Sequence, residues 1–145
     1  MRELCSIADY VVPNFTEAAF LAGQYENQET VYEEQVWELI DKLKEQGAGS
    51  VVITSVPWEK GPAVAGYDGE KGERFFLPYE YIPVRFPGTG DIFSSLMTVK
   101  LLQGEGLKES IMYTMKQLKK LLKVNVEYLE QHRELSLELL FREDE

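Results

Sequence analysis

One segment limits the possible folds of this chain more than any other: the continuous apolar run at residues 50–54, Ser-Val-Val-Ile-Thr. Such a run is typical of a strand that is buried on both faces of a parallel sheet. A shorter β-prone segment lies at residues 9–12, and two segments with helical periodicity separate the two strands. Because strand, helix, helix and strand follow in this order, the sequence predicts a parallel crossover and an α/β layer architecture.

The two helices between these strands have recognisable starts. The first is expected at residues 14–21, where apolar residues recur with helical spacing. The second is expected to open at a capping box formed by Thr30 and Glu33, the spacing at which two side chains satisfy free N–H groups at a helix start. Its stripe of core residues consists of Val36, Trp37, Ile40 and Leu43.

The middle of the chain has a different pattern. Residues 62–67 and 74–77 flank a polar turn and predict a hairpin. Residues 81–86 predict another strand, which ends at a proline. Trp58 is expected in a loop at residues 57–61, where it would be open to a ligand or a partner.

Two further helices are expected towards the C-terminus. The first follows Asp91 and is apolar nearly all round, and a helix of that composition is normally buried. The second follows Gly106 and has a regular apolar stripe, while residues 135–141 predict a closing edge strand. The lysines of the long helix lie mostly off its stripe and are most simply a solvated face: Lys108, Lys116, Lys119, Lys120 and Lys123.

Length, composition and charge exclude several classes of protein. The 145 residues, 44% of them hydrophobic, suit a single domain over residues 1–145. No apolar run approaches the roughly 18 residues of a membrane span, and the first residues lack the pattern of a signal peptide. A net charge of −10 disfavours binding to nucleic acid or to an anionic membrane. The single cysteine, Cys5, together with these absences favours a cytoplasmic setting.

The string Gly88-Thr89-Gly90-Asp91 is a candidate anion site, because it lies between a predicted strand and a predicted helix. Glycines allow a ligand to approach the backbone closely, and the first N–H groups of a helix attract negative charge. Asp91 would repel a phosphate there unless it accepts a proton from the attacking hydroxyl. The alternative is a glycine-rich turn with Thr89 or Asp91 as a simple helix cap.

Two smaller candidates lie earlier in the chain. Asn14 and Glu17 have the spacing of a capping box, and they could equally lie near a phosphate-bound Mg²⁺. Thr54 and Ser55 follow the buried strand, at the carboxyl end where open α/β sheets bind ligands. Two adjacent hydroxyl residues are common, so this pair alone is weak evidence for a ligand site.

Taken in order, three strings resemble the C-terminal half of the ribokinase-like superfamily, and its pyridoxal kinases in particular. They are residues 8–18 (ADYVVPNFTEA), residues 51–55 (VVITS) and residues 88–93 (GTGDIF). The resemblance implies a three-layer α/β/α sandwich, of which this chain would be the C-terminal portion only. Related sugar kinases usually have Ala in place of Thr89, and hydroxymethylpyrimidine kinases tend to have Cys in place of Asp91. Both differences favour a kinase of vitamin B6.

The resemblance also implies a role for each motif. Asp91 would be the base that takes the proton from the 5′-hydroxymethyl group of pyridoxal, pyridoxine or pyridoxamine. The backbone of Gly88, Thr89 and Gly90 would stabilise the transferring phosphoryl group of ATP.

On the nucleotide side, Asn14 and Glu17 would lie at the triphosphate and its Mg²⁺. Thr54 and Ser55 would contact nucleotide phosphates, and the adenine would lie near Val84.

Members of this family are considerably longer than this chain, so the resemblance implies a C-terminal fragment that lacks most of the substrate pocket. Such a fragment is expected to phosphorylate pyridoxal poorly on its own. Two alternatives to a kinase of vitamin B6 stay open: a non-catalytic nucleotide-binding fragment that needs an N-terminal partner, and a relative of the hydroxymethylpyrimidine kinases. A chain with so few elements to cover its apolar strand and helix is also expected to form a homodimer.

Overall fold

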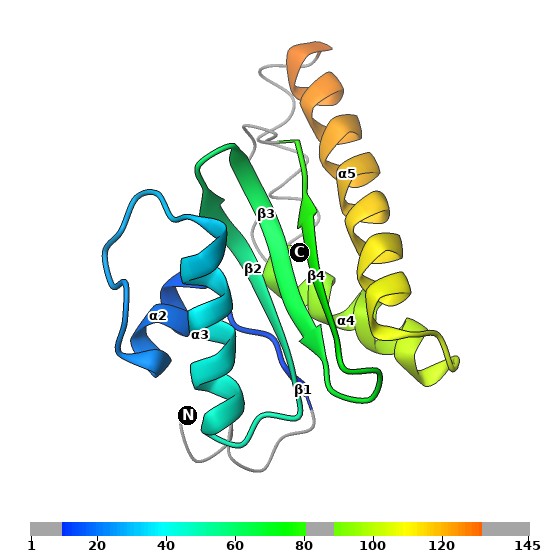
Figure 1. Ribbon diagram of the computed structural model, residues 1–145. Coiled ribbons are helices and arrows are strands. Elements are labelled where there is room, and N and C mark those ends of the chain that lie inside the picture. Colours follow the sequence, from blue (N-terminus) through cyan, green and yellow to red (C-terminus); the bar gives the residue numbers. More distant parts are fainter. Residues whose placement is uncertain (1–9, 81–88, 132–145) are drawn as a thin grey trace. The chain divides into compact units, whose positions relative to one another are not determined.

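The structure is a computed structural model that describes residues 10–80 and 89–131. The chain divides into two compact units, Met1–Tyr81 and Ile82–Glu145. Figure 1 shows the strands and the helices α2 and α3 of the first unit, and the helices α4 and α5 of the second. The single domain expected over residues 1–145 stays a prediction.

The first unit is built on a four-stranded sheet in the order β1-β2-β3-β4. The strands are β1 (Tyr10–Val11), β2 (Ser50–Trp58), β3 (Gly61–Asp68) and β4 (Glu73–Pro78). β1 and β2 are parallel, as the crossover predicted, whereas β2–β3 and β3–β4 are antiparallel. The buried run therefore has a parallel neighbour on one side only, and the sheet is mixed. β2 also extends further than expected, so the prediction that Trp58 lies in a loop is wrong: it is the last residue of β2.

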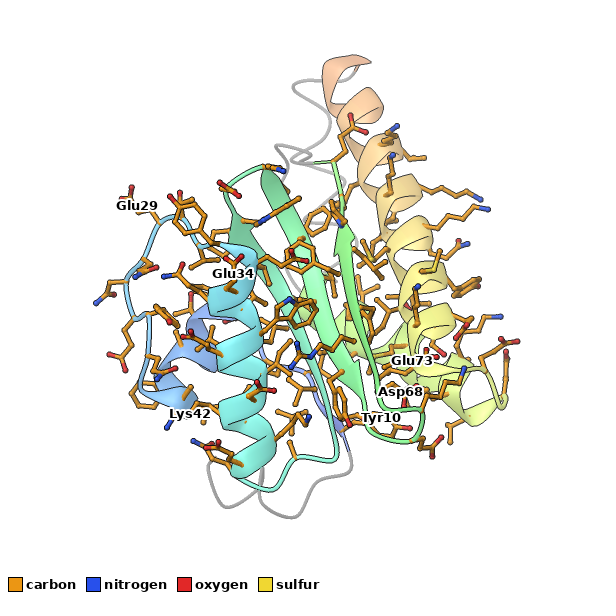
Figure 2. The ribbon with its side chains drawn as sticks, viewed as in Figure 1. Tyr10, Glu29, Glu34, Lys42, Asp68 and Glu73 are labelled. Atoms are coloured by element: carbon orange, nitrogen blue, oxygen red, sulfur yellow. The ribbon has the colours of Figure 1, made fainter. Side chains whose placement is uncertain are left out.

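The hairpin of β3 and β4 is confirmed, with Asp68 and Glu73 paired at its closed end (Figure 2). Asp68 is buried, and its carboxylate accepts the backbone N–H groups of Glu70 and Lys71 at 3.0 and 3.3 Å. A carboxylate that bonds to the backbone two residues ahead forms an Asx turn, which closes the hairpin.

Helices α2 (Phe15–Ala22) and α3 (Glu33–Glu45) lie on the same side of this sheet (Figure 1). The predicted start of the second helix is wrong by two residues, because Tyr32 and not Thr30 is the N-cap. Thr30 lies outside α3, and the cap is made instead by Gln35, whose side-chain oxygen accepts the N–H of Tyr32 at 2.9 Å.

The core of the first unit lies between these two helices and the sheet. Trp37, expected in the core, is half-buried and stands edge-on to Phe76, with ring centroids 5.9 Å apart. Trp58 packs on the same ring at 4.9 Å. The fully buried large side chains of the cluster come from α2, α3 and β2 and from the segment before α3: Leu21, Val31, Val36, Leu39, Ile40, Leu43, Val51, Ile53 and Val56.

In the second unit, α4 (Thr89–Leu102) and α5 (Leu107–Gln131) pack against each other. Phe93 on α4 and Ile111 on α5 are among the buried residues. The expectation that α4 is buried all round is wrong, because Val99 and Leu102 are 51% and 83% exposed. All five lysines of the predicted solvated face are exposed, as expected.

Several predictions lie outside the described residues, among them the strands at residues 81–86 and 135–141 and the placement of Val84 and Gly88. Within residues 10–80 and 89–131, no helix combines the length and the apolar character needed to cross a membrane.

Candidate functional site

The structure brings Asn14 and Thr54 together where the parallel pairing of β1 with β2 ends. The expectation that Thr54 and Ser55 lie at the carboxyl end of the buried strand is wrong, because β2 continues to Trp58 along its antiparallel pairing with β3. Asn14 and Thr54 form an isolated parallel bridge, and the Thr54 N–H donates to the Pro13 carbonyl at 3.0 Å. This bridge continues the parallel pairing of Tyr10 with Ser50 and of Val11 with Val51. Two of the motifs singled out in the sequence, 40 residues apart, are therefore neighbours at the carboxyl end of the parallel β1–β2 pairing, and α/β proteins bind ligands at the carboxyl ends of parallel strands.

Asn14 and Glu17 form the capping box of α2. The Asn14 side-chain oxygen accepts the Glu17 N–H at 2.8 Å, and a Glu17 carboxylate oxygen accepts the Asn14 N–H at 3.0 Å. The structure thus shows the capping box that the spacing predicts. The Asn14 and Glu17 side chains can each still form further hydrogen bonds or bind a ligand. A carboxylate has about four lone-pair positions, and one N–H occupies only one of them. The start of α2 also attracts negative charge through the helix dipole.

Ser55 has an unusual backbone conformation in the middle of β2. Its φ is +54°, in the left-handed region that residues other than glycine seldom adopt. The register with β3 shifts here, because Ile53 pairs with Ala65 while Val56 pairs with Ala63. Two residues of β2 thus face a single residue of β3, which is a β-bulge. Because of this extra residue, Ile53 and Val56 both point into the core, and Thr54 and Ser55 are left between them.

Tyr79 completes the site, and sequence reasoning missed it. It follows β4 directly, its backbone N–H donates to the Pro62 carbonyl at 3.0 Å, and its side chain lies near enough to Ser55 for the serine hydroxyl to lower the pKa of its phenol. Burial acts in the opposite direction and raises the pKa of the Tyr79 phenol above 10.0. No sequence signal marks this residue, because its contact with Ser55 depends on the pairing of three strands.

The glycine-rich motif lies in the other unit, at the start of α4. Thr89, Gly90 and Asp91 are its first three helical residues, so the predicted helix start is confirmed. The first N–H groups of an α-helix have no partner within the helix, and this is the property that the anion-site prediction requires.

The surroundings of Glu17 suit a metal ion that is coordinated mainly by the phosphates of a bound nucleotide and by water, with few ligands from the protein. Among the described residues, no three His, Cys, Asp or Glu side chains are grouped to hold a metal. Mg²⁺ commonly binds through one or two carboxylates together with substrate phosphates and water. The single half-buried carboxylate of Glu17 fits that pattern and does not fit a site made by protein alone.

Comparison with known proteins gives a family. The model of the phosphomethylpyrimidine kinase family matches residues 1–136. A search of curated proteins gave no match. Among solved structures, a Bacteroides thetaiotaomicron protein assigned as a phosphomethylpyrimidine kinase is 28% identical, with a TM-score of 0.77 over 91% of this chain and 49% of that chain.

Two pyridoxal kinases are also similar. The Bacillus subtilis enzyme, solved as an ADP complex, is 32% identical, with a TM-score of 0.64 over 80% of this chain and 44% of its own. The Lactobacillus plantarum enzyme is 29% identical, with a TM-score of 0.69 over 92% of this chain and 46% of its own.

This chain therefore spans slightly less than half the length of these three solved structures. The match of the family model covers most of the sequence, and the similar structures carry the α/β fold expected from the three strings. The chain belongs to the phosphomethylpyrimidine kinase family and has the fold of the C-terminal part of a ribokinase-like kinase.

Proposed function

We propose that this chain is the nucleotide-binding portion of an ATP-dependent kinase that phosphorylates the 5′-hydroxymethyl group of a B6 vitamer. The observation that carries the proposal is the pairing of Asn14 with Thr54 where the parallel pairing of β1 with β2 ends. Membership of a kinase family and the similarity to pyridoxal kinases support it.

In this proposal the first unit binds the phosphates of ATP. Thr54 and Ser55 donate hydrogen bonds to phosphate oxygens, and Asn14 lies beside them at the start of α2. Glu17 holds the Mg²⁺ that accompanies the triphosphate, directly or through water. When bound, Mg²⁺ neutralises charge on the phosphate oxygens.

The second unit supplies the groups for phosphoryl transfer. The Asp91 carboxylate takes the proton of the substrate hydroxyl, whose oxygen attacks the γ-phosphorus while the bond to the β-phosphate oxygen breaks and ADP leaves. The N–H groups of Gly88, Thr89 and Gly90 stabilise the charge on the transferring group. Val84 lies near the adenine in this account.

The choice of substrate has two candidates. Thr89 and Asp91 in the glycine-rich motif, and the similarity to two pyridoxal kinases, favour a B6 vitamer. The description of the family model favours a hydroxymethylpyrimidine as the second candidate. Both substrates present a hydroxymethyl group on an aromatic nitrogen ring, so the same base and anion site serve either reaction.

A competition assay tests the proposal. The protein is incubated with MgATP and equal amounts of pyridoxal and hydroxymethylpyrimidine, and the phosphorylated products are separated by mass. The proposal predicts that pyridoxal phosphate predominates. Predominance of the pyrimidine phosphate would establish the second candidate, and saturable binding of ATP with neither product would establish a non-catalytic nucleotide-binding fragment.

A further inference from the structure

Helix α5 carries an exposed ridge of basic and apolar side chains. Its members recur every four residues, so they form a single row on the helix: Lys108, Met112, Lys116, Lys120 and Val124. All of them are exposed, Met112 by 52% and Val124 by 63%. The buried residues of α5, among them Ile111 and Leu118, lie on another side of the helix. The α5 ridge therefore combines three lysines with two large apolar side chains.

The charge of the α5 ridge fits an acidic protein surface. Lys116 and Lys120 lie four residues apart, where like charges on a helix repel each other, and facing carboxylates would offset that repulsion. A second α5 in the same place would instead bring lysine against lysine. A nucleic acid or an anionic membrane would be repelled by the net charge of −10 that the whole chain carries.

An acidic surface of this kind lies on the chain itself, around the start of α3. Residues 10–41 contain seven Asp or Glu residues and no Lys, Arg or His. Four of the acidic side chains are exposed and close together in sequence: Glu26, Glu29, Glu33 and Glu34. Figure 2 shows Glu29 and Glu34 at the same end of α3. Tyr32, which is 54% exposed, lies among them in sequence, so this acidic surface also combines charge with an apolar side chain.

We propose that the α5 ridge docks on the acidic surface of a second copy of this chain. The lysines of the ridge then face the carboxylates, and its apolar side chains cover the ring of Tyr32. In a two-fold dimer each copy supplies one ridge and one acidic surface, so the contact is made twice and the assembly closes. None of the residues assigned to nucleotide binding or phosphoryl transfer takes part, so this inference does not depend on the proposed function.

Sedimentation equilibrium of charge-reversed variants tests this interface. The first variant combines Lys116→Glu with Lys120→Glu, the second combines Glu29→Lys with Glu34→Lys, and the third carries all four changes. Each of the first two brings like charges together across the interface, so we expect it to weaken dimerisation by at least about tenfold. The quadruple variant restores opposite charges and should recover most of the loss. Added salt should weaken the wild-type dimer, because salt screens exposed charges.

The matched control combines Lys60→Glu with Lys71→Glu. It changes the net charge as much as the first variant does, but at two exposed lysines that belong to neither surface, so its dimerisation should match that of the wild type. Urea unfolding of each variant shows whether it still folds. If the first variant does not fold, Lys116→Gln with Lys120→Gln replaces it, since this pair removes the charges of the ridge without reversing them and should also weaken the dimer.

A wild-type chain that is monomeric at low salt would overturn the proposal. A dimer that tolerates both reversals, or a quadruple variant that associates no better than either parent, would also overturn it, because other surfaces would then hold the two copies together. The same holds for a monomer whose stability in urea falls with each reversal and recovers in the quadruple variant, since the two surfaces would then meet within one chain.

Discussion

Asn14 lies opposite Thr54 in a parallel bridge just beyond the last residue of β1. The bridge joins the residue that caps α2 to the residue that opens the bulge of β2. One short stretch of parallel pairing therefore determines where a helix start and two hydroxyl side chains lie. The site of the first unit depends on this pairing more than on any single motif.

Asn14 is expected to have two separable roles. Asn14→Ala removes the cap and should lower the free energy of unfolding by about 0.5–2 kcal/mol. Asn14→Asp keeps a capping oxygen but adds a negative charge, so it should preserve stability and weaken MgADP binding. Urea denaturation and calorimetric titration measure the two effects. Equal MgADP affinity in Asn14→Asp and the wild type would remove Asn14 from the phosphate site.

Glu17→Gln tests the metal role against the cap. Glutamine keeps the oxygen that accepts the Asn14 N–H, so the capping box should survive and stability should change by less than about 0.5 kcal/mol. The lost charge should weaken nucleotide binding at low Mg²⁺, and the defect should shrink as Mg²⁺ is raised. A defect that is the same at every Mg²⁺ concentration would mean that Glu17 acts through the cap alone.

Gly66→Ala is expected to destabilise the sheet of the first unit. A Cβ at Gly66 would lie 2.3 Å from the Phe75 ring and 2.6 Å from the Val51 carbonyl oxygen, and the carbonyl belongs to the neighbouring strand. Overpacking of this kind typically costs about 1–3 kcal/mol, and urea denaturation would show it. Adding Phe75→Leu should recover only part of the loss, since the contact with the carbonyl remains. Wild-type stability of Gly66→Ala would show that β2 and β3 lie further apart than described.

The elements that the sequence predicted well are those set by local patterns. The helix capped by Asn14, the hairpin closed by Asp68 and the start of α4 each follow from spacing, turn residues or capping residues that are close in sequence. The parallel pair follows from the order of strand, helix, helix and strand. The resemblance to the ribokinase-like kinases added the family, because it used the order of three distant strings.

The features that were missed depend on pairing between distant segments. The bulge at Ser55 arises because Ile53 and Val56 must both face the core, which is visible only in the register with β3. Trp58 continues β2 for the same reason: it pairs with Gly61 and packs on Phe76. Tyr79 was not singled out, because it is brought near Ser55 only by the pairing of β2 with β3 and of β3 with β4.

Self-association is expected for the isolated chain. Val99 and Leu102 on α4 and Val124 on α5 are more than half exposed, at 51%, 83% and 63%, and large exposed apolar side chains favour association. Sedimentation equilibrium should therefore show a homodimer, and Leu102→Glu should shift it towards the monomer. A wild-type chain that stays monomeric at high concentration would contradict this prediction.

The most direct test of the account is the turnover of Asp91→Asn, measured with MgATP and pyridoxal in the form of the protein that gives the highest rate. Loss of a general base typically slows a reaction by about 10²–10⁴-fold, while binding of MgADP should be unchanged. Asp41→Asn is the matched control, because Asp41 is a surface residue of α3. Its carboxylate forms an ion pair with the Arg74 guanidinium, with 3.6 Å between the nitrogen and the oxygen. The account predicts wild-type turnover for the control and a loss in that range for Asp91→Asn. Equal turnover by Asp91→Asn and the wild type would contradict it.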